Sequence, residues 1–174
     1  DGAMYNTGQS CCSVERIYVH EKIHDAFVEH FVNTVKGYRM GDPMSEDTYL
    51  GAITRAPQLE VLAAQVADAR IKGAQLLLGG HQGPRPGQWF EATVLTQVNH
   101  GMSVMREESF GPVIGIQKVA SDDEAVRLMN DTRYGLTAGV YTPNEARARA
   151  LLAQVRAGTV YWNCCDRVSP RLPW

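Results

Sequence analysis

The feature that most constrains the fold is the alternation of strand-like and helix-like patterns along nearly the whole chain. Residues 15–20 alternate polar and apolar side chains, as a half-buried strand does. Residues 22–35 repeat apolar side chains at steps of three and four, which is typical of an amphipathic helix. Residues 57–72 repeat the helical pattern, and the apolar run at residues 74–80 is typical of a strand buried on both faces of a parallel sheet. The pattern predicts an α/β domain.

The second half of the chain continues this alternation. Further strands are predicted over residues 89–98, 112–119, 137–142 and 158–163, a loop over 81–88, and helices over 125–130 and 144–155. Ser121, followed three residues later by Glu124, is the signature of a capped helix start. Strands that alternate with helices favour parallel pairing, so we predict an open, largely parallel sheet flanked by helices.

The composition of the 174-residue chain is that of an ordinary globular protein. Hydrophobic residues make up 44% and charged residues 21%, which argues against a disordered or fibrous chain. Seventeen basic residues stand against nineteen acidic ones without a basic block, so we expect no nucleic-acid partner. No apolar run approaches the roughly 18 residues of a membrane span, and the N-terminal segment lacks the features of a secretory signal. We expect no membrane partner and a cytoplasmic location.

The four cysteines form two adjacent pairs, Cys11-Cys12 and Cys164-Cys165. This is sparse for a disulfide scaffold, and the C-x2-C spacing of zinc sites is missing from the sequence. We therefore expect four thiols. Cys11 follows a Gly-x turn, and at the start of a helix it would gain thiolate character from the exposed amides. The alternative for each cysteine is a buried, unreactive thiol.

The sequence matches one metal-binding pattern that we do not expect to form a metal site. Residues 20–24 match H-E-x-x-H, in which two histidines on one helix bind zinc. We expect His20 to end a strand and Glu21 to begin the next helix, so the two histidines do not share a helix and we expect no metal site. All five histidines, at positions 20, 24, 30, 81 and 100, are expected at the surface.

A second candidate segment lies at residues 106–113. Its paired carboxylates, Glu107 and Glu108, lead into Phe110-Gly111-Pro112 at the entrance to a predicted strand. Acidic side chains in such a place bind hydroxyl groups, as they bind ribose. Taken alone, the segment is better explained as a charged loop before a strand.

Together, the two segments resemble a known family. The pattern N-x-G-Q-x-C-x4-R begins at Asn6, and E-E-x-F-G-P-V follows at residues 107–113; the pair is similar to the motifs of the aldehyde dehydrogenase superfamily. Further landmarks stand in the family's order: Gly41-Asp42-Pro43, Gly79-Gly80, Phe90-Glu91-x-Thr93, Asn130-x3-Tyr134-Gly135-Leu136 and Gly158-x4-Asn163. The resemblance implies that residues 1–174 are part of an aldehyde dehydrogenase catalytic domain.

The resemblance also implies the chemistry. Cys11 would be the nucleophile that forms a thiohemiacetal and then a thioester, with NAD or NADP as cofactor and an aldehyde as substrate, which is oxidised to a carboxylic acid. Glu108 would bind the nicotinamide ribose, and Phe110 would pack beside the nicotinamide. Cys12 would shape the substrate pocket. A substrate-tunnel loop would contain Asn163, Cys164, Cys165, Asp166 and Arg167.

Other parts of the family's machinery have no counterpart in this sequence. The general-base glutamate, the oxyanion asparagine and the cofactor-binding domain precede the cysteine in the family, and its oligomerisation strands follow the tunnel loop. We therefore expect a piece of a longer protein, whose parent is a homo-oligomer (a dimer or a tetramer), and an isolated chain that is inactive. Two alternatives stay open: cofactor-independent thiol acyl transfer or ester hydrolysis by Cys11, and a non-catalytic assembly fragment.

Overall fold

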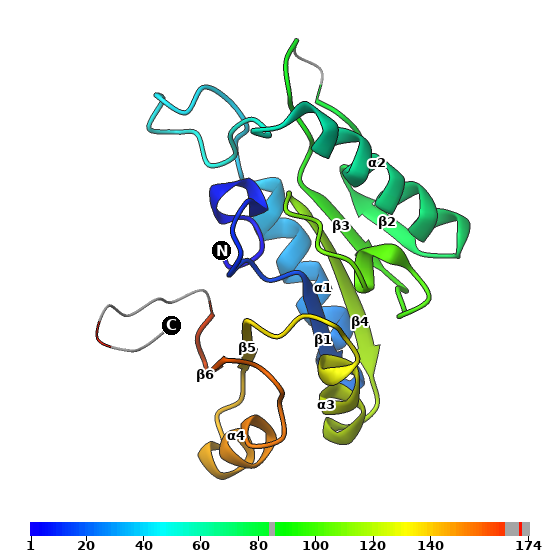
Figure 1. Ribbon diagram of the computed structural model, residues 1–174, viewed down its shortest axis with the longest axis vertical. Helices are drawn as coiled ribbons and strands as arrows, with labels where there is room; N and C mark the ends of the chain where they lie inside the picture. Colours follow the sequence, from blue (N-terminus) through cyan, green and yellow to red (C-terminus); the bar gives the residue numbers. More distant parts are fainter. Residues whose placement is uncertain (84–85, 166–170, 172–174) are drawn as a thin grey trace. The chain divides into compact units, whose positions relative to one another are not determined.

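The computed structural model describes residues 1–83, 86–165 and 171. The chain divides into two compact units, residues 1–118 and 119–174, and Figure 1 labels the helices and strands of both. In the described residues, no helix is both long and apolar enough to cross a membrane.

The first unit contains a four-stranded sheet in the order β1-β4-β3-β2. Its strands are β1 (Arg16–His20), β2 (Gln75–Leu78), β3 (Thr93–Thr96) and β4 (Val113–Val119). The two central strands, β3 and β4, are parallel, with Thr93 opposite Val113 and Thr96 opposite Ile116. The prediction of an α/β fold with a largely parallel sheet is confirmed.

The expectation for residues 74–80 is wrong in one respect, because β2 is an antiparallel edge strand. It pairs with β3, Gln75 opposite Thr96, and the register shifts between Leu76 and Leu78. Gln75 is exposed and the three leucines are only half-buried. A parallel pair needs a crossover, usually a helix, and the described residues between β2 and β3 contain none. The chain therefore turns back on itself and reverses direction.

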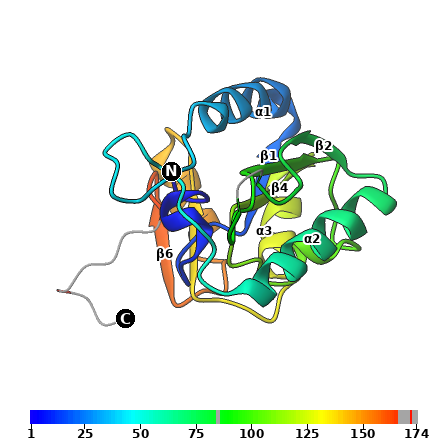
Figure 2. The same ribbon diagram turned by 90° about the horizontal axis from the view of Figure 1, so that it is seen from above.

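Two long helices cover the two faces of this sheet. Helix α1 (Glu21–Lys36) packs Val35 and neighbouring apolar side chains against Val94 and Ile114. Helix α2 (Ala56–Ile71) packs Leu62 and its neighbours against Leu95. Successive strand residues point to opposite faces, so Val94 and Leu95 belong to different core clusters. Figure 2 shows the sheet between α1 and α2, which makes three layers.

The strand predicted over residues 89–98 is shorter than expected. Only Thr93–Thr96 form β3. Gln97 has a φ of 55°, in the left-handed region, which turns the chain out of the sheet directly after the strand. The short 3-10 helix η2 (Ser103–Met105) then leads toward β4.

The second unit contains two helices and a separate two-stranded sheet. Helix α3 (Asp122–Asn130) begins three residues earlier than predicted. The capping signature is confirmed, since the Ser121 hydroxyl accepts a hydrogen bond from the Glu124 backbone N–H at 3.1 Å. Strands β5 (Thr137–Val140) and β6 (Thr159–Trp162) are parallel, and α4 (Glu145–Leu152) connects them.

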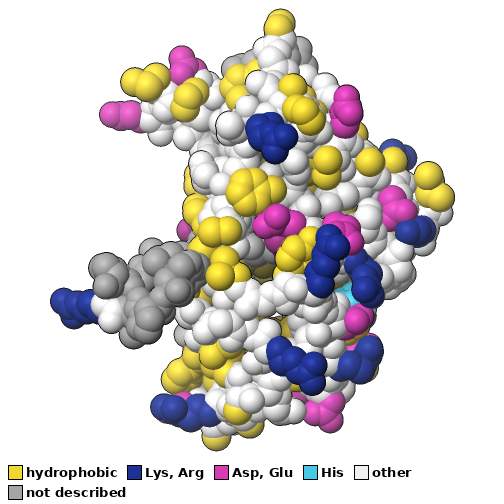
Figure 3. Space-filling view, in the orientation of Figure 1, with side chains coloured by type: hydrophobic (Ala, Val, Ile, Leu, Met, Phe, Trp, Pro, Cys, Tyr) yellow, Lys and Arg dark blue, Asp and Glu magenta, His cyan; other side chains and the backbone are white. Residues whose placement is uncertain are grey.

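Charged side chains of both signs occur on the face drawn in Figure 3. Several acidic and basic side chains form ion pairs on the surface, among them Arg39 with Asp47 at 2.6 Å and Arg149 with Glu145 at 2.7 Å. Exposed pairs of this kind contribute little to stability. They keep the surface mixed in charge, as the composition indicates.

Candidate active site

The cysteine segment is held in an unusual backbone conformation. The 3-10 helix η1 (Tyr5–Gly8) precedes Cys11, and Asn6, Thr7 and Gly8 have φ angles of 50°, 59° and 69°. The Asn6 side-chain amide donates to the Gln9 carbonyl oxygen at 2.8 Å and closes this tight segment. Residues with positive φ are strained unless they are glycine, so the segment depends on contacts made elsewhere.

Two side chains of the motif fix the segment to residues 51–54. The Thr7 hydroxyl accepts from the Gly51 backbone N–H at 2.8 Å. The Gln9 amide donates to the Ala52 carbonyl at 3.1 Å, and its oxygen accepts from the Thr54 N–H at 2.8 Å. These hydrogen bonds give the Thr and Gln of the motif a structural purpose: they position the loop that carries the cysteine.

Cys11 lies in a turn, and the expectation of a helix start at this position is wrong. Residues 11–13 form a turn and a bend, and β1 begins three residues later at Arg16. Helix-end amides therefore do not act on this thiol. Cys11 is exposed, whereas Cys12 is only 7% exposed, and their two sulfur atoms lie 3.7 Å apart.

The fold brings the second motif against the first. A Cβ atom on Gly8 would lie only 2.2 Å from the Gly111 carbonyl oxygen, so the two backbones are in direct contact and only glycine fits. The Glu15 carboxylate accepts hydrogen bonds from the backbone N–H groups of Ser109 at 2.9 Å and Phe110 at 3.1 Å. Glu108 and Phe110, which the sequence assigned to the cofactor, therefore lie on a turn joined to the cysteine segment.

Glu15 is the charged group at the centre of this arrangement. Burial raises its pKa above the ordinary glutamate value; the two backbone N–H donors partly oppose this, and the negative charge of Glu108 adds to the rise. No motif singled out Glu15, Gln58 or Gln65, although all three contact the turn. One sequence feature could have indicated this contact: Gln65 is a polar residue within the apolar stripe of α2, and its side chain is only 4% exposed.

The predicted tunnel residues belong to the second unit. Asn163, with a φ of 51°, follows β6, and its side chain accepts from the Thr142 N–H at 2.9 Å and donates to the Thr142 carbonyl at 3.1 Å. The Cys164 thiol contacts the Cys165 carbonyl at 3.6 Å. Asp166 and Arg167 lie outside the described residues.

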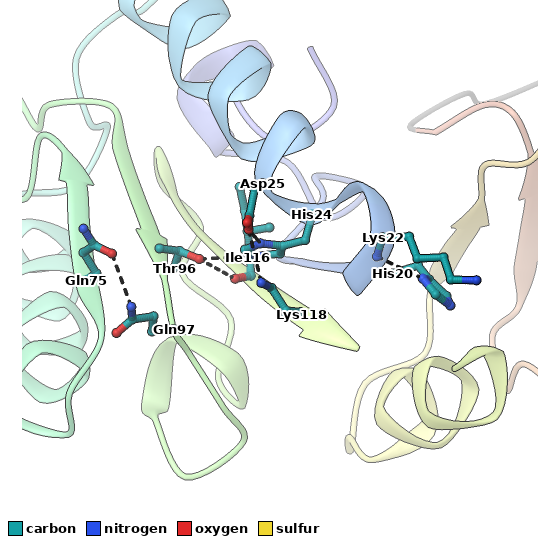
Figure 4. Close-up of polar contacts among 9 residues, drawn as sticks. All are labelled: His20, Lys22, His24, Asp25, Gln75, Thr96, Gln97, Ile116 and Lys118. Atoms are coloured by element: carbon teal, nitrogen blue, oxygen red, sulfur yellow. Dashed lines mark hydrogen bonds and ion pairs between the residues drawn. The ribbon is translucent and has the colours of Figure 1, made fainter. Parts of the chain in front are cut away.

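The two histidines of the H-E-x-x-H pattern, His20 and His24, do not share a helix. His20 ends β1 and caps α1, where its Nδ1 accepts from the Lys22 N–H at 3.3 Å. The His24 ring bonds to Asp25 at 2.7 Å and to Thr96 at 3.4 Å, and Lys118 pairs with Asp25 at 3.2 Å (Figure 4). His24 is buried, so the expectation that all five histidines lie at the surface is wrong. Within the described part of the chain, no group of three His, Cys, Asp or Glu residues could hold a metal ion.

Comparisons with known proteins agree with this geometry. The chain is 37% identical over 173 residues to an aldehyde dehydrogenase-like protein of Schizosaccharomyces pombe, covering 99% of this chain and 34% of that protein. It is 36% identical to a succinate-semialdehyde dehydrogenase [NADP(+)] of Mycobacterium bovis, covering 99% of this chain and 38% of the relative. The solved structure of an NAD-dependent aldehyde dehydrogenase from Sinorhizobium meliloti superposes with a TM-score of 0.95 at 36% identity, over 99% of this chain and 34% of that one.

The chain therefore spans about a third of the length of the curated relatives it matches. The match to the Aldehyde dehydrogenase family extends over residues 1–174, and it includes both motifs that the fold brings into contact. On these grounds, the chain belongs to the aldehyde dehydrogenase family.

Proposed function

We propose that residues 1–174 are part of the catalytic domain of an NAD(P)-dependent aldehyde dehydrogenase that oxidises an aldehyde to a carboxylic acid. The observation that carries the proposal is the contact between the two motif segments: Gly8 lies against the Gly111 backbone, and Glu15 accepts from the N–H groups of Ser109 and Phe110. The substrate carbon is bonded to the sulfur of the nucleophile when it loses its hydride. The segment that carries the nucleophile must therefore lie next to the segment that binds the hydride acceptor. Family membership supports the same reaction class.

Cys11 is the proposed nucleophile. It is exposed, so an aldehyde can reach its sulfur. The thiolate forms a C–S bond with the aldehyde carbon, and the carbonyl π electrons move to oxygen, which gives a thiohemiacetal. The hydroxyl proton then leaves and the C=O bond re-forms as the hydrogen departs with its bonding electron pair as hydride, which NAD or NADP would accept when bound; a thioester is left on Cys11. Water adds to the thioester, the C–S bond breaks, and the acid leaves while the thiol is restored.

The residues of the turn fit a nicotinamide cofactor. Glu108 is exposed and Phe110 is 36% exposed, although Ser109 between them is fully buried. A carboxylate accepts hydrogen bonds from ribose hydroxyls, and an aromatic ring packs against a flat heterocycle. When bound, NAD or NADP supplies the acceptor for the hydride. The relatives include one named for NADP(+) and a structure described as NAD-dependent, so the proposal covers both.

The second unit contributes the proposed substrate-tunnel residues. The Asn163 amide is hydrogen-bonded to Thr142, which fixes the backbone directly before Cys164 and Cys165; Asp166 and Arg167, the other proposed tunnel residues, lie outside the described residues. Cys12, buried beside Cys11, shapes the pocket wall. An aldehyde is the proposed substrate class, and the whole protein is proposed to be a cytoplasmic homo-oligomer, a dimer or a tetramer.

The test uses the protein as its source cell makes it. With NAD or NADP and a panel of aldehydes, reduced-cofactor absorbance should rise steadily, and Cys11→Ser should lower the rate about a thousandfold or more. Glu29→Gln is the control, since it changes an exposed side chain on α1 and should keep the activity. Ester turnover by Cys11 with no cofactor requirement would favour the thiol acyl-transfer alternative. An unreactive Cys11 in a stable complex with another chain would favour the assembly fragment.

A further inference from the structure

The Glu108–Phe110 turn has no regular secondary structure, yet side chains bond its backbone on two sides. The N–H groups of Ser109 and Phe110 donate to Glu15, which precedes β1. The carbonyl oxygens of Ser109 and Glu108 accept from the side-chain amides of Gln58 and Gln65, the latter at 3.4 Å. We call Glu15, Gln58 and Gln65 the turn cradle.

The chemistry of each cradle residue matches the group that it holds. A carboxylate has two acceptor oxygens, and each oxygen of Glu15 takes one N–H: Oε2 that of Ser109 and Oε1 that of Phe110. Gln58 and Gln65 are seven residues apart on α2, two helical turns, so they share one helix face and both donate to carbonyl oxygens of the turn. The turn is therefore clamped between the start of β1 and α2.

This clamp maintains a conformation that the turn would not hold alone. Phe110 has a φ of 47°, which is strained for a bulky residue and persists only where surrounding contacts impose it. The same conformation buries the side chain of Ser109 completely and leaves those of Glu108 and Phe110 exposed. The cradle thus decides which side chains the turn presents outward.

We propose that Glu15, together with Gln58, is a positioning residue for the nicotinamide cofactor: it sets cofactor affinity by fixing the Glu108–Phe110 turn, without touching the cofactor itself. This inference rests on the proposed function, because it assigns the turn to cofactor binding. It gives Glu15 a role distinct from that of the nucleophile, although only three residues lie between Cys11 and Glu15 in the sequence.

The kinetic test compares Glu15→Gln with Glu29→Gln in the protein as its source cell makes it. Glutamine keeps one acceptor oxygen but places an NH2 group against the second backbone N–H, so one charge-assisted hydrogen bond is lost. The KM for the cofactor should rise about tenfold, while kcat at saturating cofactor and the alkylation rate of Cys11 stay within about twofold. Gln58→Leu should shift KM in the same direction. Glu29 is exposed on α1, and its substitution should change nothing.

A second measurement, on the protein as its source cell makes it, detects the hydrogen bonds of the turn cradle without depending on turnover. In amide NMR spectra, the Ser109 and Phe110 resonances should titrate together with the Glu15 carboxyl group. The titration should vanish in Glu15→Gln and persist in Glu29→Gln. Unchanged resonances elsewhere in β3 and β4 establish that each variant is folded.

The outcomes separate the two proposals. Turnover in the wild-type protein with an unchanged cofactor KM in Glu15→Gln overturns the cradle inference and leaves the proposed function intact. Equal losses of kcat and Cys11 alkylation in that variant also overturn it, since Glu15 would then act on the nucleophile. No cofactor-dependent turnover in the wild-type protein overturns the proposed function, and with it the cofactor role of Glu15. In that case, the titration still decides whether Glu15 holds the turn.

Discussion

At the scale of single residues, adjacent side chains have opposite environments. Cys11 is exposed and Cys12 is buried, with sulfur atoms 3.7 Å apart. Ser109 is buried between exposed Glu108 and Phe110. The motif resemblance predicted which residues form the candidate site, but it did not predict which of their side chains are exposed and which are buried.

The difference between the two thiols predicts a difference in labelling. Cys11 should react with iodoacetamide faster than Cys12, because burial keeps the reagent from the second sulfur. It should also react faster than Cys164 and Cys165, which are half-buried. Timed alkylation followed by fragment-ion mass spectrometry distinguishes the four sites. Equal labelling of all four thiols would contradict a preformed site at Cys11.

Glu15 predicts a pH dependence of stability with a definite sign. Its pKa is raised in the folded state, chiefly by burial, so the folded chain binds the proton more tightly than the unfolded chain does. The stabilising contribution is complete below the unfolded pKa and is lost as pH rises through the folded pKa. Glu108 is the charged neighbour that acts on it.

Urea unfolding of the wild type and Glu15→Gln checks this from about pH 4 to pH 8. The wild-type free energy of unfolding, minus that of the variant, should fall as pH rises through the Glu15 pKa. Asp25 and Asp68 have lowered pKa values, set mainly by bonds to His24 and Lys72. Their contributions are lost as pH falls and cancel in the difference. A difference that stays constant or rises with pH would count against a raised Glu15 pKa.

At the scale of helices, strands and turns, local patterns predicted where most elements lie. The end of β1 at His20 and the start of α1 at Glu21 are where the sequence placed them. The direction of β2 was not predictable from its residues, because Leu76, Leu77 and Leu78 form the same apolar run in either orientation. Direction followed from the missing crossover helix, which is a property of residues outside the strand.

In the candidate site, too, some features were predictable from local sequence and others depend on residues far apart in the chain. Motif resemblance identified the cysteine segment and the Glu108–Phe110 turn, but the cradle joins residues too far apart in sequence for any local pattern to show. Glu15 lies 94 residues before Ser109, and Gln58 lies 51 residues before it. Such contacts depend on how strands and helices pack. Gln65 looks like an interruption of the apolar stripe until its carbonyl partner on Glu108 is known.

Gly8→Ala should separate the two motif segments. Its φ of 69° disfavours any side chain, and a Cβ there would lie 2.2 Å from the Gly111 carbonyl oxygen. Gly73→Ala is the matched control, since Gly73 has a φ of 98° with nothing within 4 Å of its Cβ position. The control should lose only the strain energy, about 1–2 kcal/mol. Urea unfolding should show a clearly larger loss for Gly8→Ala; equal losses would mean that the two backbones do not meet.

The cap of α3 predicts a smaller, local effect. Ser121→Ala removes the acceptor for the Glu124 N–H and should lower the free energy of unfolding by about 1 kcal/mol. Ser121→Asp keeps an acceptor at the same position and should stay within a few tenths of the wild type. Circular dichroism during urea unfolding measures both. An alanine variant as stable as the wild type would show that the cap contributes nothing.

At the scale of the whole molecule, the chain accounts for about a third of the length of its curated relatives. In the proposed function, the described residues supply the nucleophile segment and one cofactor-binding turn. The general-base glutamate, the oxyanion asparagine and most of the cofactor site would come from outside residues 1–174. The intact mass of the protein isolated from its source would show whether one chain carries them.

This division predicts the behaviour of residues 1–174 by themselves. Mixed with NAD or NADP and an aldehyde panel, the chain should show no sustained rise in reduced-cofactor absorbance. Labelling of Cys11 should still occur, because the thiol is exposed. The protein as its source cell makes it is the positive control under identical conditions. Sustained turnover by residues 1–174 would mean that the remaining machinery is dispensable.

The bond from Glu15 to Phe110 also imposes an order of events during synthesis. The two residues are 95 positions apart, so at translation rates of about 5–20 residues per second, roughly 5–20 s separate their additions to the nascent chain. Until Phe110 and Gly111 have left the ribosome, the cysteine segment lacks both the turn that bonds Glu15 and the backbone that packs against Gly8. A ribosome stalled before residue 109 therefore carries the thiol without a site around it.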